Sequence, residues 1–252
     1  MYGSLLNELS KMCKNLTVRI DERLIHLFEK KNRTIKFIGQ KDKIDEKDFD
    51  NHLSIADLGK FLRYEKKQFS NVEFPYIDVD ERVSKKIKNT FFNKNKMLIG
   101  TSWTSKSEMG LDKSIDYKSL VSIFKLQNTS FIDLEYIDSE EDKKNIYKIT
   151  GKKIHRINEV DYYNNILGVS SIINACDLII TCSNVNAHIS GALGKKTFLL
   201  LPLGKGRLLN WSSEKNHSIW YPSVKIFQQT KPGDWSDPIN KIEEEILKCQ
   251  SC

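Results

Sequence analysis

Short apolar runs alternate along the chain with segments of helical periodicity. Two runs, LTVRI (16–20) and IKFIG (35–39), have the alternating pattern of strands. LLNELSKM (5–12) and DERLIHLFEKK (21–31) place their apolar residues at helical spacing and predict helices. The stretch from 40 to 96 is polar and only weakly periodic, and we interpret it mainly as loops.

A cleaner series begins at residue 97. Its predicted strands are nearly continuous in apolar character, at 97–103, 130–136, 153–157, 178–181 and 197–202. Predicted helices separate them, at 116–126, 139–150, 162–176 and 186–194. Strands that are apolar throughout are typical of parallel strands covered on both faces. The alternation of strands and helices therefore predicts an α/β fold.

A last helix is expected over 237–247, capped by Asp237 with Pro238 at its first position. The break near 94–97 predicts two domains, 1–95 and 96–252. The first of them opens on a helix, whereas a nucleotide-binding half normally starts with a central strand. The aromatic segment WYPSVKIFQQTKPGDW (220–235) is expected to pack against the sheet edge.

Composition narrows the class of protein. Of 252 residues, 39% are hydrophobic and 29% charged, which indicates a globular chain. No apolar stretch approaches the roughly 20 residues of a membrane helix, and the amino terminus lacks a signal-peptide pattern. The five cysteines have no framework spacing, so a reducing, cytoplasmic location is expected. The net charge of +7 comes from scattered lysines, without a motif for nucleic acid.

The segment CSNVNAHISGALGKKT (182–197) is the first candidate site, because it follows the predicted strand 178–181. Ligands bind at the carboxyl ends of strands in parallel sheets, where helices begin. The free N–H groups at such a helix start attract anions, phosphates included. Ser183 and Asn184 are placed to cap the helix or to donate to phosphate. His188, one turn on, is either a partner of a diphosphate or a core-edge histidine.

The second candidate site follows the strand that starts at residue 97. It comprises the hydroxyls of Thr101 and Ser102, together with Lys113, whose charge can neutralise phosphate. A polar loop with a solvated lysine explains the same residues. Arg207 follows strand 197–202 beside two glycines. Glu135 is positioned either to bind ribose hydroxyls or to start the next helix. No metal motif is present in the sequence.

Longer stretches resemble a known family. CDLIITCSNVNAHISGALGKKTFLLLPLGKGR, followed by WYPSVKIFQQTKPGDW, is similar to the carboxyl-terminal domain of family 9 (heptosyltransferase-like) glycosyltransferases. The nearest likeness is to the branch often fused to tetratricopeptide repeats in bacteria. YGSLLNELSK, DFDNHLSIADLGKFLR and MLIGTSWTSKS with LDKSID extend the resemblance over essentially the whole chain, most strongly from 97 to 236.

The resemblance implies a GT-B-like architecture, in which two Rossmann-like domains face a cleft. It implies sugar transfer from a nucleotide-diphosphate sugar to a glycan, lipid-linked or protein acceptor, with no metal and no further cofactor. Ser183, Asn184 and His188 would fall on the loop that holds the donor diphosphate, with His188 catalytic. Thr101, Ser102 and Lys113 would fall on the facing phosphate-binding loop, and Arg207 nearby.

Two departures from the family pattern leave alternatives open. Heptosyltransferases usually have Asp-Thr where this sequence has Ser183-Asn184, although the repeat-linked relatives often carry Ser-Asn. The family's first strand and Gly-Asp loop, which supply its catalytic base, should precede Tyr2, and the amino-terminal domain is expected to be truncated. The alternative to an enzyme is therefore a non-catalytic nucleotide-sugar-binding module or an inactive remnant that has lost the acceptor-side loop.

Overall fold

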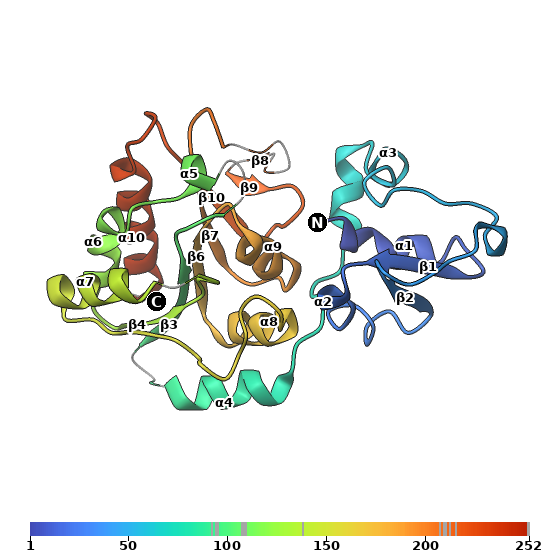
Figure 1. Cartoon of the computed structure of the whole chain (residues 1–252). Coiled ribbons are helices and arrows are strands. Elements are labelled where there is room, and N and C mark those ends of the chain that lie inside the picture. Colours follow the sequence, from blue (N-terminus) through green and yellow to red (C-terminus); the bar gives the residue numbers. More distant parts are fainter. Residues whose placement is uncertain are drawn as a thin grey trace.

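The structure is a computed structural model of the chain. It describes residues 1–91, 93, 96–106, 110–137, 139–206, 208, 211, 213–214 and 216–250. Figure 1 shows two parts, each built on its own sheet, with the polypeptide crossing between them ahead of helix α4. Among the described helices, none is both long and apolar enough to cross a membrane.

The amino-terminal part has a small parallel sheet of β1 (Leu16–Ile20) and β2 (Ile35–Gly39). Both strands lie where the sequence predicts them. The first predicted helix is confirmed as a 3₁₀ turn (Tyr2–Leu5) that continues into α1 (Leu6–Ser10). The second is shorter than expected, because α2 spans only Glu22–Ile25, capped by Asp21. The region interpreted as loops contains α3 (Gly59–Leu62) and 3₁₀ turns at Glu46–Asp48 and Lys66–Asn71.

The carboxyl-terminal part is an eight-stranded sheet of order β5-β4-β3-β6-β7-β10-β9-β8. The first six strands in this order are parallel, and β9 and β8 are antiparallel additions. The strands are β3 (Met97–Ser102), β4 (Thr129–Asp133), β5 (Ile154–His155), β6 (Leu178–Cys182), β7 (Thr197–Leu201), β8 (Ser213–Glu214), β9 (His217–Ser218) and β10 (Val224–Gln228). All five predicted strands of this part are present.

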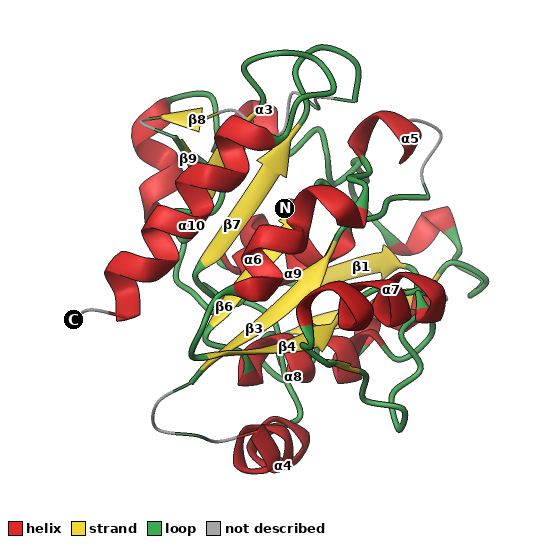
Figure 2. Ribbon diagram, turned by 90° about the vertical axis from the view of Figure 1, so that its left-hand side faces the viewer, coloured by secondary structure: helices red, strands yellow, loops and turns green. Residues whose placement is uncertain are grey.

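Helices cover both faces of this sheet. In Figures 1 and 2, α6, α7 and α10 lie over one face, and α8 and α9 over the other. Successive residues of a strand point to opposite faces of the sheet and pack in different cores. Ile99 packs in the core on the α10 side, and Leu98 in the core on the α8 side. The helices are α4 (Glu81–Phe91), α5 (Gly110–Lys113), α6 (Val121–Lys125), α7 (Glu140–Thr150), α8 (Ile166–Ala175), α9 (Val185–Ala192) and α10 (Ser236–Gln250), with a 3₁₀ turn at Tyr117–Leu120 ahead of α6.

The last helix starts earlier than the sequence predicts. Asp237 is not its cap: it lies inside the first turn and forms an ion pair with Lys241. The Asp234 carboxylate instead accepts from the backbone N–H of Ser236, at 2.9 Å. The segment expected to cover the sheet edge contains β10, which extends the parallel sheet beyond β7.

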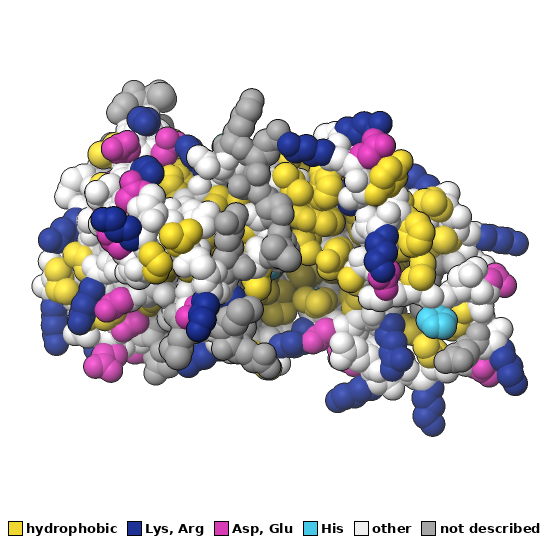
Figure 3. Space-filling view, turned by 90° about the horizontal axis from the view of Figure 1, so that it is seen from above, with side chains coloured by type: hydrophobic (Ala, Val, Ile, Leu, Met, Phe, Trp, Pro, Cys, Tyr) yellow, Lys and Arg dark blue, Asp and Glu magenta, His cyan; other side chains and the backbone are white. Residues whose placement is uncertain are grey.

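The two parts meet along a linker, at an aromatic cluster, and where α2 packs against α8. The indole of Trp220, from the carboxyl-terminal part, contacts the rings of Tyr2 and Phe69 edge-on. Figure 3 shows a hollow between the two parts, with hydrophobic side chains on its walls. The domain boundary at 95/96 stays a prediction, and α4, which precedes it, packs on α8 of the larger sheet.

Candidate functional site

The candidate residues gather at the carboxyl edge of the larger sheet. Strands β3, β4 and β6 are neighbours and parallel, so the loops that follow them meet at one edge. Helix α9 begins there, at Val185, directly after β6. The two candidate loops therefore lie side by side.

Ser102 and Asn184 belong to a partly buried hydrogen-bond network that joins these loops. The Asn184 amide donates to Ser102 Oγ and to the carbonyl of Thr104, each at 3.1 Å. Its Oδ1 accepts the backbone N–H of Asn186 at 3.0 Å, which caps α9. Asn186 Nδ2 donates to Ser102 Oγ (3.0 Å) and to the carbonyl of Leu134 (2.9 Å). Both amide protons of Asn184 are therefore used within the protein, and its geometry is that of a residue that positions the start of α9.

A cluster of aromatic rings surrounds His188. The ring of Trp211 stacks on the imidazole, with centroids 4.6 Å apart and planes at 18°. Trp211 Nε1 donates to Ser183 Oγ at 2.8 Å, and the Tyr221 hydroxyl lies 3.2 Å from His188 Nδ1. Ser183, Trp211 and Tyr221 are all buried. The imidazole is thus held from two sides beside the first turn of α9.

Burial sets the protonation state of this histidine. Loss of solvent lowers the pKa of His188 to about 3, and nearby positive charges, Lys113 among them, act in the same direction. The imidazole is therefore neutral at pH 7 in this structure, and a contact with a ligand would be made by hydrogen bonding rather than by charge. The sequence does not link Trp211 and Tyr221 to His188, because only the tertiary fold brings these distant segments together.

The other candidate residues within the described chain lie in or beside the same edge of the sheet. Lys113 is buried in α5, and its charge acts on His188. Gly206, in the loop after β7, approaches Asp112 so closely that a Cβ would lie 3.0–3.2 Å from it, which places that loop against α5. Thr101 is buried within β3, and its carbonyl accepts from the N–H of Leu134. Arg207 lies outside the described residues.

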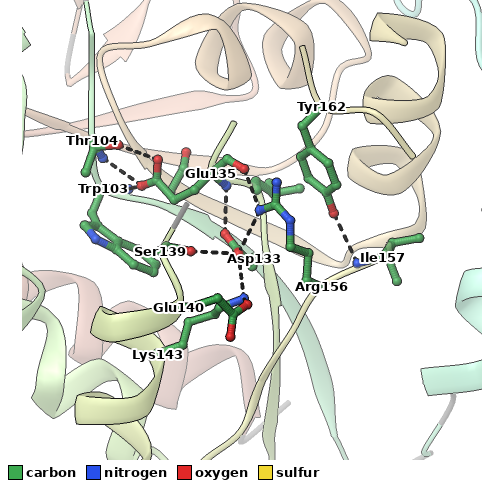
Figure 4. A network of polar contacts seen from close by, with 12 residues as sticks. Trp103, Thr104, Asp133, Glu135, Ser139, Glu140, Lys143, Arg156, Ile157 and Tyr162 are labelled. Atoms are coloured by element: carbon green, nitrogen blue, oxygen red, sulfur yellow. Dashed lines mark hydrogen bonds and ion pairs between the residues drawn. The ribbon is translucent and has the colours of Figure 1, made fainter. Parts of the chain in front are cut away.

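Two carboxylates at the end of β4, Asp133 and Glu135, lie at this edge of the sheet (Figure 4). Glu135 is fully buried and accepts hydrogen bonds from the backbone N–H groups of Trp103 and Thr104 and from the Thr104 hydroxyl. Burial raises the pKa of Glu135 to about 7, although those hydrogen bonds lower it in part. Glu135 does not begin the next helix, because α7 starts at Glu140; it holds the loop after β3 in place, and the ribose contact stays a prediction.

Asp133, which ends β4, is the second of these carboxylates. It forms ion pairs with Arg156 at 2.9 Å and with Lys143 at 3.2 Å, and it accepts from the Ser139 hydroxyl at 2.9 Å. Figure 4 shows the three partners converging on this side chain, Arg156 from just after β5, and Ser139 and Lys143 from the cap and first turn of α7. Because Asp133 is fully buried, these partners are needed to hold its charge.

Comparisons with known proteins agree with this architecture. The structure resembles that of E. coli ADP-heptose LPS heptosyltransferase II, with a TM-score of 0.61 and 13% identity over 99% of this chain and 94% of that one. It also resembles a family 9 glycosyl transferase from Veillonella parvula, with a TM-score of 0.59 and 12% identity over 98% and 90%. The α/β, GT-B-like fold predicted from the sequence is therefore confirmed.

Sequence comparison supports fewer conclusions than structural comparison does. No protein-family profile matches this sequence. Protein FlbA of Caulobacter vibrioides is 27% identical over 112 residues, which are 44% of this chain and 18% of FlbA. The chain therefore matches less than a fifth of that relative's length. At these identities the comparisons establish the fold, and activity has to be argued from the site.

Proposed function

We propose that this protein is a glycosyltransferase that takes a sugar from a nucleotide-diphosphate sugar, without a metal ion. The observation that carries the proposal is the placement of His188. A neutral imidazole, held by Trp211 and Tyr221, lies beside a capped helix start and near the charge of Lys113. These are the groups that a diphosphate needs, since it is bound by helix-start N–H groups and by donors aimed at its oxygens.

In this proposal the chemistry of the site is stabilisation of the leaving group. When the bond between the sugar and the diphosphate breaks, negative charge grows on the phosphate oxygens. In the tautomer that the proposal requires, the Tyr221 hydroxyl donates to His188 Nδ1, so that the imidazole proton is on Nε2 and this nitrogen is a donor. Together with the α9 dipole and Lys113, this donor stabilises the developing charge, and such fixed donors are usually the largest catalytic contribution.

The proposal leaves the base and sugar of the donor, and the acceptor, unspecified. Ser183 and Asn184 stand where heptosyltransferases usually have Asp-Thr. The proposal therefore does not require heptose, and it includes hexosyl as well as heptosyl transfer. The hollow between the two parts of the molecule (Figure 3) is the proposed place of the acceptor. Arg207 and Thr101 remain proposed donor contacts.

Substitution of His188 tests the proposed function. We expect His188→Ala to reduce donor hydrolysis or sugar transfer by about 100-fold or more, because it removes a donor to the leaving diphosphate. Release of nucleoside diphosphate from a panel of nucleotide sugars measures this. His52→Ala, at an exposed histidine, is the control and should leave turnover unchanged. Equal turnover in the two variants would contradict the assignment.

A non-catalytic nucleotide-sugar-binding module is the second candidate. It is favoured by the amino-terminal sheet, which consists of two paired strands within the described residues, β1 and β2. A donor that binds in calorimetry, but releases no nucleoside diphosphate with any acceptor supplied, would support the module. Release of nucleoside diphosphate would support the enzyme.

A further inference from the structure

A second surface, beside α7, has the features of a binding groove. It lies between α7 and the strand β5, and encloses about 670 Å³. One wall is the face of α7 from Glu140 to Lys148, and the other is the segment from Lys153 to Asn158. The described cations of the groove are Lys143, Lys144, Lys148, Lys153 and Arg156. In Figure 1, α7 lies on the face of the sheet that is turned away from the amino-terminal part.

The charges of this groove do not balance. Lys143 and Arg156 are paired with the buried Asp133, and Lys143 also pairs with Glu140. Glu140 is the one carboxylate among the described lining residues. Five cations against the carboxylates of Glu140 and Asp133 leave an excess of three positive charges. The pKa of His155 is lowered, by burial and then by the charge of Lys153, so this histidine adds no charge near pH 7.

The groove also contains an open sheet edge. Strand β5 is the first strand of the larger sheet and pairs only with β4 among the described residues. An edge strand presents unpaired N–H and C=O groups, which another extended segment can complete. The ring of Tyr147, 57% exposed on the α7 wall, adds an apolar contact for a side chain of such a segment.

From these features we infer that the groove binds an extended acidic peptide segment of a partner protein, which adds to the sheet along β5. Main-chain hydrogen bonds to the edge strand orient the bound segment, and the excess positive charge favours segments that carry carboxylates. The α7 wall from Glu140 to Lys148 is about 12 Å long at the helical rise. An extended chain of about four residues, at about 3.3 Å per residue, has the same length.

Fluorescence anisotropy with a defined probe tests this inference on the full chain. The probe is a fluorescein-labelled peptide of alternating glutamate and valine, measured at low salt, where exposed charges are least screened. We expect Lys144→Glu, Lys148→Glu and Lys153→Glu together to weaken binding by about tenfold or more, because three favourable pairs become repulsive. The matched control reverses Lys85, Lys118 and Lys125, which are exposed elsewhere, and should leave affinity unchanged.

A second probe separates strand addition from charge alone. The same acidic peptide, N-methylated at alternate residues, keeps its carboxylates but cannot complete the edge of β5. We expect it to bind several-fold more weakly than the parent peptide. The inference is overturned if the parent peptide does not bind, if both triple reversals weaken it equally, or if N-methylation has no effect. The readout is binding, so its outcome is independent of any sugar transfer.

Discussion

At the scale of single residues, Glu135 is the least expected feature of the site. It is a fully buried carboxyl group with a pKa near 7, placed where two backbone N–H groups of the loop after β3 converge. In the unfolded chain the same group titrates near 4.5. The folded protein therefore holds this proton more tightly than the unfolded chain does, and stability must change between these two pH values.

The expected direction follows from that difference. A raised carboxyl pKa means that the Glu135 contribution to the free energy of unfolding is fully present below pH 4.5 and is lost as pH rises to about 7. The loss should reach about 3 kcal/mol. In Glu135→Gln the loss should be absent, since the amide does not titrate and its oxygen can still accept the two backbone N–H groups.

Urea unfolding at pH 5 and at pH 7.5 measures the difference between wild type and variant. Glu141→Gln, at an exposed carboxylate on α7, serves as control and should follow the wild-type pH dependence. If wild type and Glu135→Gln respond to pH in the same way, the carboxyl group is already ionised in the folded protein below pH 5.

The sequence placed the candidate residues in loops that follow strands, but it did not give the contacts of their side chains. Serine and asparagine after a strand can bind phosphate or can hold loops in place. Their positions in the sequence do not distinguish these two roles. The structure shows that Asn184 uses its amide to join β3 and α9. Trp211 and Tyr221 follow α9 by some twenty to thirty residues, and their contacts with His188 depend on how those segments fold back onto it.

At the scale of elements, α9 is held unusually close to the segment before β10. The contact occurs at Gly191, where a Cβ would lie 2.5 Å from the ring of Tyr221. Tyr221 is the residue whose hydroxyl contacts His188. Because Gly191 has no side chain, the ring of Tyr221 can pack directly on α9. This close packing places the Tyr221 hydroxyl next to His188.

Gly191→Ala should therefore damage both stability and the site. The added methyl overlaps the Tyr221 ring, and we expect a loss of about 1–3 kcal/mol in the free energy of unfolding, as for other overpacked cores. Urea denaturation followed by circular dichroism measures it. The matched control is Gly59→Ala on α3, where the nearest atom lies 3.9 Å from the new Cβ; it should be neutral or slightly stabilising. Equal stability of the two variants would show that Tyr221 moves aside without cost.

The strands of the larger sheet were predictable because burial on both faces makes them almost wholly apolar. Residues 197–201 and 178–182 are buried without exception. Helix α4 was missed, since only Ser84 and Ile87 are buried in it and its sequence is dominated by charge. Strand β10 was missed because it lies within an aromatic segment whose side chains suggested packing and obscured the run VKIFQ.

At the scale of the whole molecule, the linker between the two parts is bonded to both. The N–H of Asp78 donates to Leu27 of the amino-terminal part, at 2.7 Å, and its carbonyl accepts from Ser170 of α8, at 2.9 Å. The N–H of Tyr76 donates to the carbonyl of Ala192 at the end of α9. Bonds from one short segment to both parts give the hollow between them a defined geometry, with α9 on one side.

The central claim is that the edge at which α9 begins holds the diphosphate of an activated sugar. Titration calorimetry of the full chain with a panel of nucleoside-diphosphate sugars tests it most directly. The account predicts that at least one donor binds at a single site, and that His188→Ala removes or strongly weakens this binding while His52→Ala does not. Absence of binding across the panel, or undiminished binding to His188→Ala, would contradict it.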